Sequence, residues 1–113
     1  MKILGTGLTG LVGSRIVELL KDTYEFDFSE ADITNRRAIK EKIKDSDASI
    51  VLHLAAKADV DGCERDEKED KRILEYQKLR EQEREWNNKK TAWGVNVFGT
   101  KNIVDACLEK KKN

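Results

Sequence analysis

The sequence contains no proline, one histidine and two cysteines, and its 22 basic and 22 acidic side chains give a net charge of zero. The two cysteines, Cys63 and Cys107, lack a CxxC spacing and are too few for a disulfide framework. The balanced charge gives no electrostatic basis for binding nucleic acid or a membrane surface. No apolar run approaches the roughly 20 residues that span a bilayer, and the N-terminus has no signal-peptide layout. We therefore expect a cytoplasmic protein with neither nucleic-acid nor membrane partners.

Charged residues make up 39% of the chain but are unevenly distributed. Residues 65–90 hold nine basic and eight acidic side chains in 26 positions, with neither glycine nor proline. Such a composition predicts a helical segment. Its few apolar residues fall within one broad stripe of a helix: Ile73, Tyr76, Leu79 and Trp86. The chain has no repeat and no Gly/Ser-rich linker, so its 113 residues indicate one domain, 1–113.

The apolar pattern alternates between strand and helix periods. Strands are predicted at 2–4, 24–28 and 49–55, and helices at 11–21, 35–44 and 93–108. A very short strand at 31–33 remains open, and Thr34 is a suitable cap for the second helix. The run at 49–55 lacks alternation, as is typical of a parallel strand covered on both faces. The order of elements predicts a parallel sheet in an α/β fold.

The strongest chemical signal is a glycine motif, TGLTGLVG, between the first strand and the first helix. A helix N-terminus offers backbone N–H donors and a favourable dipole to a pyrophosphate. Gly7 permits a tight turn, Gly10 leaves room for phosphates, and Gly13 allows close packing of the helix on the sheet. The motif therefore predicts a dinucleotide site that includes Gly7, Thr9, Gly10, Leu11, Val12 and Gly13. The alternative is a glycine-rich turn that only closes the strand–helix corner.

Dinucleotide sites also place an acid at the end of the second strand, where it holds the adenosine ribose. Asp27 lies 20 residues after Gly7 and has that position in the sequence. Its carboxylate would accept hydrogen bonds from both ribose hydroxyls and would repel a 2′-phosphate, which favours NAD over NADP. Ser29, Arg36 and Arg37 lie close enough in sequence to modify that preference. The alternative for Asp27 is a solvated acid at a strand end.

Three stretches carry a family pattern: TGLTGLVG (6–13), ADIT (31–34) with HLAAKADVDGCE (53–64), and AWGVNVFGTKNIVDAC (92–107). Together they resemble the extended short-chain dehydrogenase/reductase family, and within it the dTDP-4-dehydrorhamnose reductase-like enzymes. The resemblance covers residues 1–64 and 91–110. It implies the N-terminal part of a Rossmann-type, doubly wound parallel sheet that binds NAD or NADP. It further implies an oxidoreductase that reduces a nucleotide-linked keto sugar.

The resemblance also assigns roles to matching positions. The residues implied to surround the pyrophosphate are Gly7, Gly10, Leu11 and Val12. Asp32 and Ile33 would meet the adenine, with the acid at the exocyclic amine. The residues implied to border the ribose and nicotinamide are Leu54, Ala55, Ala56 and Lys57. Ala55 and Ala56 have plain core packing as their alternative. Asn96 matches a family asparagine with a structural role.

Neither His53 nor the acids and the cysteine near it are predicted to have a catalytic or metal-binding role. We interpret His53 as a strand histidine with satisfied hydrogen bonds rather than as a catalyst or ligand. It does not form a credible metal site with Asp59, Asp61 and Cys63, because the spacing suits no standard cage.

The family's catalytic Tyr-x-x-x-Lys pair is not in this sequence. Tyr24 is followed four residues later by Phe28, and Tyr76 by Arg80. We therefore predict no catalytic residues in the chain and expect the Tyr and Lys to follow Asn113 in a complete enzyme. The next strand of the family's sheet would also follow. This leaves 49–55 as an apolar sheet edge, through which we expect the chain to self-associate.

Relative to the family, residues 65–91 are an insertion, because family members join the two flanking strings through a much shorter connection. We weigh two interpretations: a solvated helical excursion, or a lid or partner-binding surface anchored by Trp86, Tyr76 and Leu79. For the chain as a whole, the first hypothesis is the cofactor-binding portion of a reductase. The second is a non-catalytic dinucleotide-binding or regulatory module, and the third is an interaction protein that uses the charged helix.

Overall fold

The computed structural model describes residues 1–57, 60–76 and 79–110, without the side chains at 60, 61 and 79. Its centre is a parallel sheet of β1 (Lys2–Thr6), β2 (Glu25–Ser29) and β3 (Ile50–His53), in the order β2-β1-β3. Thr6 pairs with Ser29 on one side and His53 on the other, so the strands end at one level. The predicted α/β fold with a parallel sheet is confirmed.

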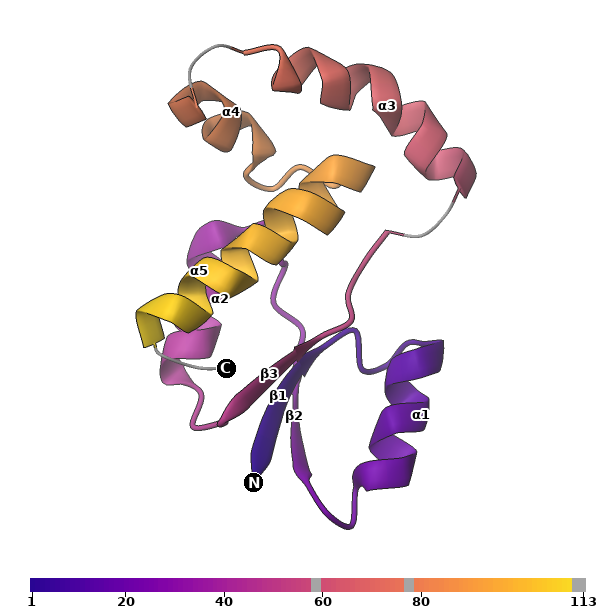
Figure 1. Cartoon of the computed structure of the whole chain (residues 1–113), viewed down its shortest axis with the longest axis vertical. Helices are drawn as coiled ribbons and strands as arrows, with labels where there is room; N and C mark the ends of the chain where they lie inside the picture. The colour runs from indigo at the N-terminus through magenta and orange to yellow at the C-terminus, as the bar shows by residue number, and fades with distance from the viewer. Residues whose placement is uncertain (58–59, 77–78, 111–113) are drawn as a thin grey trace.

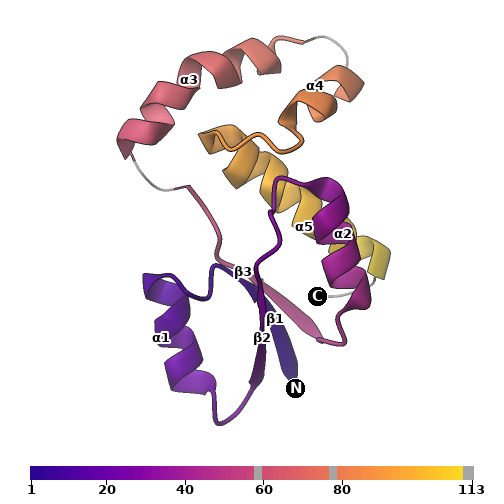
Figure 2. The same cartoon turned by 180° about the vertical axis from the view of Figure 1, so that it is seen from behind.

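Helices cover both faces of the sheet, as a doubly wound fold requires (Figures 1 and 2). α1 (Leu11–Leu20) lies on one face, and α2 (Arg36–Asp45) lies with α5 (Thr100–Lys110) on the other. The main core fills the second side and contains Leu4, Ile33, Ile39, Ile43, Ala48, Ile103, Ala106 and Cys107. The segment before α5 is a π-helical turn, η1 (Gly94–Gly99).

Several local predictions are corrected. Residues 31–33 form no strand, because the Asp32 side chain accepts the Thr34 backbone N–H at 3.0 Å and turns the chain. The cap of α2 is Asn35, which accepts the Ala38 N–H at 3.1 Å, and not Thr34. β3 ends at His53, so 54–57 continue as a loop rather than as strand.

α1 buries less of its apolar face than its spacing predicts. Its only buried residue is Gly13, while Leu11, Val12 and Leu19 are exposed. Among the described residues, no other helix lies on this face of the sheet, so the outer side of α1 is not covered (Figure 1).

The charged insertion forms most of α3 (Val60–Leu74), which begins five residues before it, and all of α4 (Leu79–Trp86). Both helices lie beyond the carboxyl ends of the strands (Figure 1). Ile73, Trp86 and Phe98 form a second small core beneath them. Trp86 is 3% exposed and stacks on Trp93 with 6.4 Å between ring centroids. Trp86 therefore packs the insertion internally, and its predicted role as an anchor for a partner is wrong. The side chain of Leu79 lies outside the described residues.

Among the described residues, no helix is both long and apolar enough to cross a bilayer.

Candidate functional site

The glycine turn between β1 and α1 is pressed against neighbouring backbone. Gly7 has a φ of 68°, and a Cβ there would lie 2.7 Å from the Ala55 nitrogen. A Cβ on Gly13 would lie 2.4 Å from the Gly7 carbonyl oxygen and 2.5 Å from Leu8 Cα. Only glycine fits at either position, since backbone atoms cannot rotate away from a side chain. The turn is therefore fixed directly beside the segment that follows β3.

Gly10 occupies the N-cap position of α1 and brings no side chain to cap the helix. Its carbonyl accepts the Ser14 N–H at 2.9 Å, which begins the helical hydrogen bonding. The amides of 11–13 precede that bond and belong to the first turn, which has no carbonyl partners within its own helix. Leu11 is 91% exposed, so this end of the helix opens to solvent. Open first-turn amides at the positive end of the helix dipole can bind an anion.

A buried network holds the ends of β1 and β3 together. The Thr6 hydroxyl accepts the backbone N–H groups of 54–55 at 3.2 Å and donates to His53 Nδ1 at 2.6 Å. The Thr100 hydroxyl donates to the Asn96 carbonyl at 2.7 Å, so it accepts from His53 Nε2 at 3.0 Å. These bonds assign a neutral imidazole with its proton on Nε2. Burial lowers the pKa of His53 from its ordinary value, consistent with that state.

The segment after β3 is clamped by Asn96. The Asn96 side chain accepts the Lys57 N–H at 2.7 Å and donates to the Lys57 carbonyl at 2.8 Å. The Lys57 ammonium pairs with Asp66 of α3 at 2.5 Å, and this hydrogen bond lowers the pKa of Asp66. Asn96 thus has the structural role that the resemblance implied, and His53 is satisfied as interpreted from the sequence.

Asp32 lies in the turn after β2. Its Oδ1 accepts the Thr34 backbone N–H at 3.0 Å and the Thr34 hydroxyl at 2.7 Å, while its Oδ2 pairs with Lys90 Nζ at 3.1 Å. Burial alone would raise the pKa of Asp32, but the hydrogen bonds from Thr34 and Lys90 lower it overall. The neighbouring Ile33 is buried in the main core.

The position predicted for Asp27 requires a correction. β2 continues to Ser29, and Asp27 pairs in register with Leu4, two residues before the strand ends. The Asp27 carboxylate also helps to raise the pKa of Lys2, the first residue of β1, although the hydrogen bond from Asp47 is the larger cause. Asp27 is therefore set back from the edge where the glycine turn lies.

The remaining predicted residues meet at the carboxyl edge of the sheet. The glycine turn contributes its exposed residues Thr9 and Gly10, and the loop after β3 contributes half-buried Leu54 and Ala55 and exposed Ala56. Two residues of the site have no role predicted from the sequence: Thr6, although it lies in the glycine motif, and Lys90, whose partner Asp32 is 58 positions away. The position of Thr6 at the end of a strand could have indicated its role. No local signal in the sequence indicates that Lys90 pairs with Asp32.

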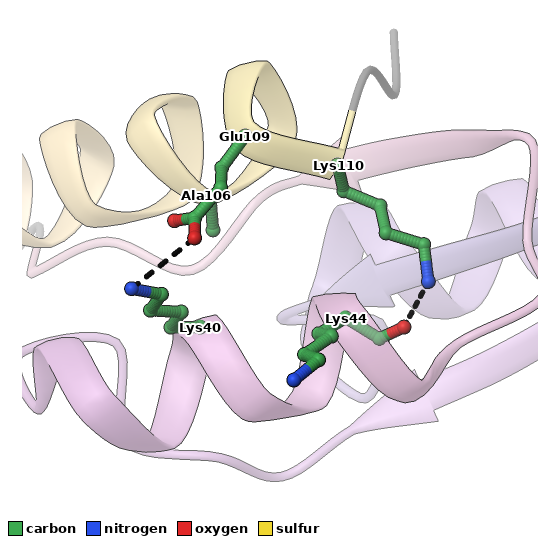
Figure 3. Close-up of a pocket in the computed structure, with 5 residues that line it drawn as sticks. All are labelled: Lys40, Lys44, Ala106, Glu109 and Lys110. Atoms are coloured by element: carbon green, nitrogen blue, oxygen red, sulfur yellow. Dashed lines mark hydrogen bonds and ion pairs between the residues drawn. The ribbon is translucent and has the colours of Figure 1, made fainter.

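One hollow of the described surface lies away from this edge. A hollow of about 290 Å³ lies between α2 and α5, where Lys40 pairs with Glu109 at 3.2 Å and Lys110 contacts the Lys44 carbonyl (Figure 3). It lies on the helices, away from the strand ends where open α/β sheets bind ligands. Within the described part of the chain, no group of three or more His, Cys, Asp or Glu residues is placed to hold a metal. Asp59 and the side chain of Asp61 lie outside that part.

The chain is similar to known proteins of one family. A profile of the RmlD substrate binding domain matches residues 1–79. A probable low-salt glycan biosynthesis reductase of Haloferax volcanii is 32% identical, over 52% of this chain and 24% of that protein.

Solved structures share the fold. A dTDP-4-dehydrorhamnose reductase of Yersinia enterocolitica is 28% identical with a TM-score of 0.72, over 98% of this chain and 32% of its own. A Bacillus anthracis dTDP-4-dehydrorhamnose reductase in complex with NADP is 22% identical with a TM-score of 0.70, over 99% and 34%. A UDP-glucose 4-epimerase of Thermus thermophilus in complex with NAD is 21% identical with a TM-score of 0.71, over 98% and 35%.

The chain spans between 24% and 35% of the length of these relatives. The resemblance to dTDP-4-dehydrorhamnose reductase-like proteins that the motifs predicted is confirmed, as is the Rossmann-type fold. The chain belongs to the RmlD substrate binding domain family.

Proposed function

We propose that this chain is the dinucleotide-binding portion of an NAD- or NADP-dependent reductase acting on a nucleotide-linked keto sugar such as dTDP-4-dehydrorhamnose. The observation that carries the proposal is the contact between two segments: the glycine turn lies against the loop after β3, at the carboxyl edge of a parallel sheet. Ligands of open α/β sheets bind at this edge. The family match and the reductase relatives support the choice of substrate class.

The residues fit a dinucleotide. A side chain at Gly7 or Gly13 would clash with the backbone of the turn, and Gly10 leaves the start of α1 without a side chain, so the cradle is shaped for backbone contact with phosphates. We assign the pyrophosphate to the motif residues Gly7, Thr9, Gly10, Leu11, Val12 and Gly13. We assign the adenine to Asp32 and Ile33, and the ribose and nicotinamide to Leu54, Ala55, Ala56 and Lys57. When bound, the dinucleotide would supply a hydride.

The choice between NAD and NADP rests on Asp27. If its carboxylate reaches the adenosine ribose, it repels a 2′-phosphate, and we propose NAD as the preferred cofactor. Because Asp27 lies two residues before the end of β2, its carboxylate has a longer distance to span to the ribose. Structural relatives are found in complex with either cofactor, NADP in the Bacillus anthracis reductase and NAD in the Thermus thermophilus epimerase.

A second candidate is a non-catalytic dinucleotide-binding or regulatory module. Both candidates bind the dinucleotide, but only the first belongs to an enzyme that transfers a hydride. Since no residue of this chain is assigned to proton transfer, we expect the chain by itself to bind but not to reduce. The cytoplasm remains its expected location, and the proposal includes self-association through the edge of β3 that pairs with no strand among the described residues.

Fluorescence titration with NADH and NADPH tests the proposal. We expect the wild type to bind NADH more tightly than NADPH, and Gly10→Val to bind neither, because its side chain would occupy the space of the phosphates. Gly10 has extended backbone, and a Cβ there meets only the Gly7 carbonyl at 3.3 Å, so the variant should fold. Thr23→Val, on the exposed turn after α1, is the matched control. A folded wild type that binds neither cofactor would refute the proposal.

A further inference from the structure

The last residues of the insertion, 87–91, form a strap across the start of α2. The Asn88 N–H donates to the Thr34 carbonyl at 2.8 Å, and the Asn87 side chain accepts the Arg36 N–H at 3.1 Å. On the other side, the Lys89 carbonyl lies 2.2 Å from the position that a Cβ on Gly94 would take. The strap is thus held between α2 and η1 by its backbone and by the Asn87 side chain, so the position of Lys90 in the strap is fixed without a ligand.

Lys90 connects the two loops that follow the outer strands. Its carbonyl lies 3.4 Å from the Lys57 ammonium, after β3, and its own ammonium lies 3.1 Å from Asp32 Oδ2, after β2. The Lys90 side chain is 71% exposed and the Asp32 side chain 33% exposed. An ion pair this open to water stabilises a fold very little. Both groups face the carboxyl edge of the sheet, where the proposed cofactor would bind.

The hydrogen-bonding capacity of Asp32 decides how it can meet a ligand. A carboxylate oxygen has two acceptor positions, and both positions on Oδ1 are taken by Thr34. Oδ2 accepts only Lys90 among the described groups and retains one acceptor position. The Lys90 ammonium has three N–H donors, of which Asp32 uses one. The pair therefore presents an acceptor beside a donor, about 3 Å apart.

The proposed function already places the adenine amine at Asp32, and we propose that Lys90, from the insertion, makes a second contact to the base and thereby selects adenine. Asp32 Oδ2 accepts from the exocyclic amine, and Lys90 donates to the neighbouring ring nitrogen N1. Adenine carries this donor and this acceptor at adjacent ring positions, and proteins read unpaired bases along that edge. Hypoxanthine reverses the order, because it has a carbonyl in place of the amine and a proton on N1. The inference rests on the proposed function and adds Lys90 as a specificity-determining residue from the insertion.

The test compares the affinities of the chain for NADH and for its hypoxanthine analogue. We expect the wild type to prefer NADH. Lys90→Met should weaken NADH binding about tenfold, the effect of one hydrogen bond to a charged group. It should change hypoxanthine dinucleotide binding much less, so that the preference for adenine falls. Lys90→Arg retains donors and should keep the preference. Lys101→Met removes a lysine that pairs with Asp105 at 2.6 Å on α5, and serves as the matched control.

Each result decides the matter. Unchanged NADH binding by Lys90→Met would overturn the inference while leaving the proposed function intact. An equal loss for both dinucleotides would also overturn it, because it would mean that Lys90 only holds the strap in place. A folded wild type that binds neither dinucleotide would refute the proposed function itself. Far-UV circular dichroism of each variant establishes that it is folded.

Discussion

Replacing Gly7 by alanine should destabilise the protein far more than the same change at Gly10. Gly7 has a φ of 68°, where an L-residue costs roughly 1–2 kcal/mol. Its new Cβ would also lie 2.7 Å from Ala55 N and 2.8 Å from the Leu54 carbonyl carbon. Overpacking of this kind adds about 1–3 kcal/mol. The two contributions together predict a loss of about 2–5 kcal/mol in the free energy of unfolding.

Gly10 provides the comparison. Its φ of −73° suits any residue, and a Cβ would meet only the Gly7 carbonyl at 3.3 Å. The replacement of an N-cap glycine by alanine should cost less than about 1 kcal/mol. Both substitutions reduce the entropy of the unfolded chain alike, so this effect cancels in the comparison.

Urea unfolding followed by far-UV circular dichroism measures both variants against the wild type. We expect a clearly lower midpoint for Gly7→Ala and a nearly unchanged one for Gly10→Ala, with similar slopes. Equal stabilities of the two variants would show that the turn is not pressed against the loop after β3, and the reasoning about the cradle would fail.

Two further predictions concern pH and association. Burial lowers the pKa of His53, the one histidine of the chain, so the unfolded state binds its proton first as the pH falls. The contribution of His53 to the free energy of unfolding should therefore be fully present above the unfolded-state pKa of about 6.5 and decline as the pH falls toward the lowered folded-state pKa. The urea midpoints of His53→Gln should lack this decline. A variant with the same pH profile as the wild type would contradict the assignment. Separately, the sedimentation coefficient should rise with concentration because the edge of β3 is unpaired within the described sheet and the neighbouring Val104 is 49% exposed. Val104→Lys should weaken this association, and a wild type that stays monomeric at all concentrations would refute it.

The main elements of the fold were predictable because their signals are local. Apolar runs predicted all three strands, and the glycine motif predicted where the first strand turns into a helix. A strand at 31–33 was left open because this apolar segment is very short, and the turn found there depends on the Asp32 side chain. The charged segment was correctly predicted as helical, but its division into two helices has no glycine or proline to mark it.

Contacts between segments that are far apart in the chain could not be predicted from the sequence. An anchor role for Trp86 was one of two interpretations of the charged segment, whereas the structure buries this side chain with Ile73 and Phe98. Asp27 has the right separation from Gly7, but separation along the chain does not fix strand register. The pairing of Lys90 with Asp32 brings together residues from either side of β3 and leaves no pattern in either segment.

The central claim is that a nicotinamide dinucleotide binds where the glycine turn meets the loop after β3. Nuclear magnetic resonance of the ¹⁵N-labelled chain during titration with NADH tests it most directly. We predict saturable shifts in the backbone amides of 7–13, 32–33 and 54–57, with those of α4 and the C-terminal half of α5 unchanged. Absence of shifts in a folded sample, or shifts confined to the hollow between α2 and α5, would contradict the account.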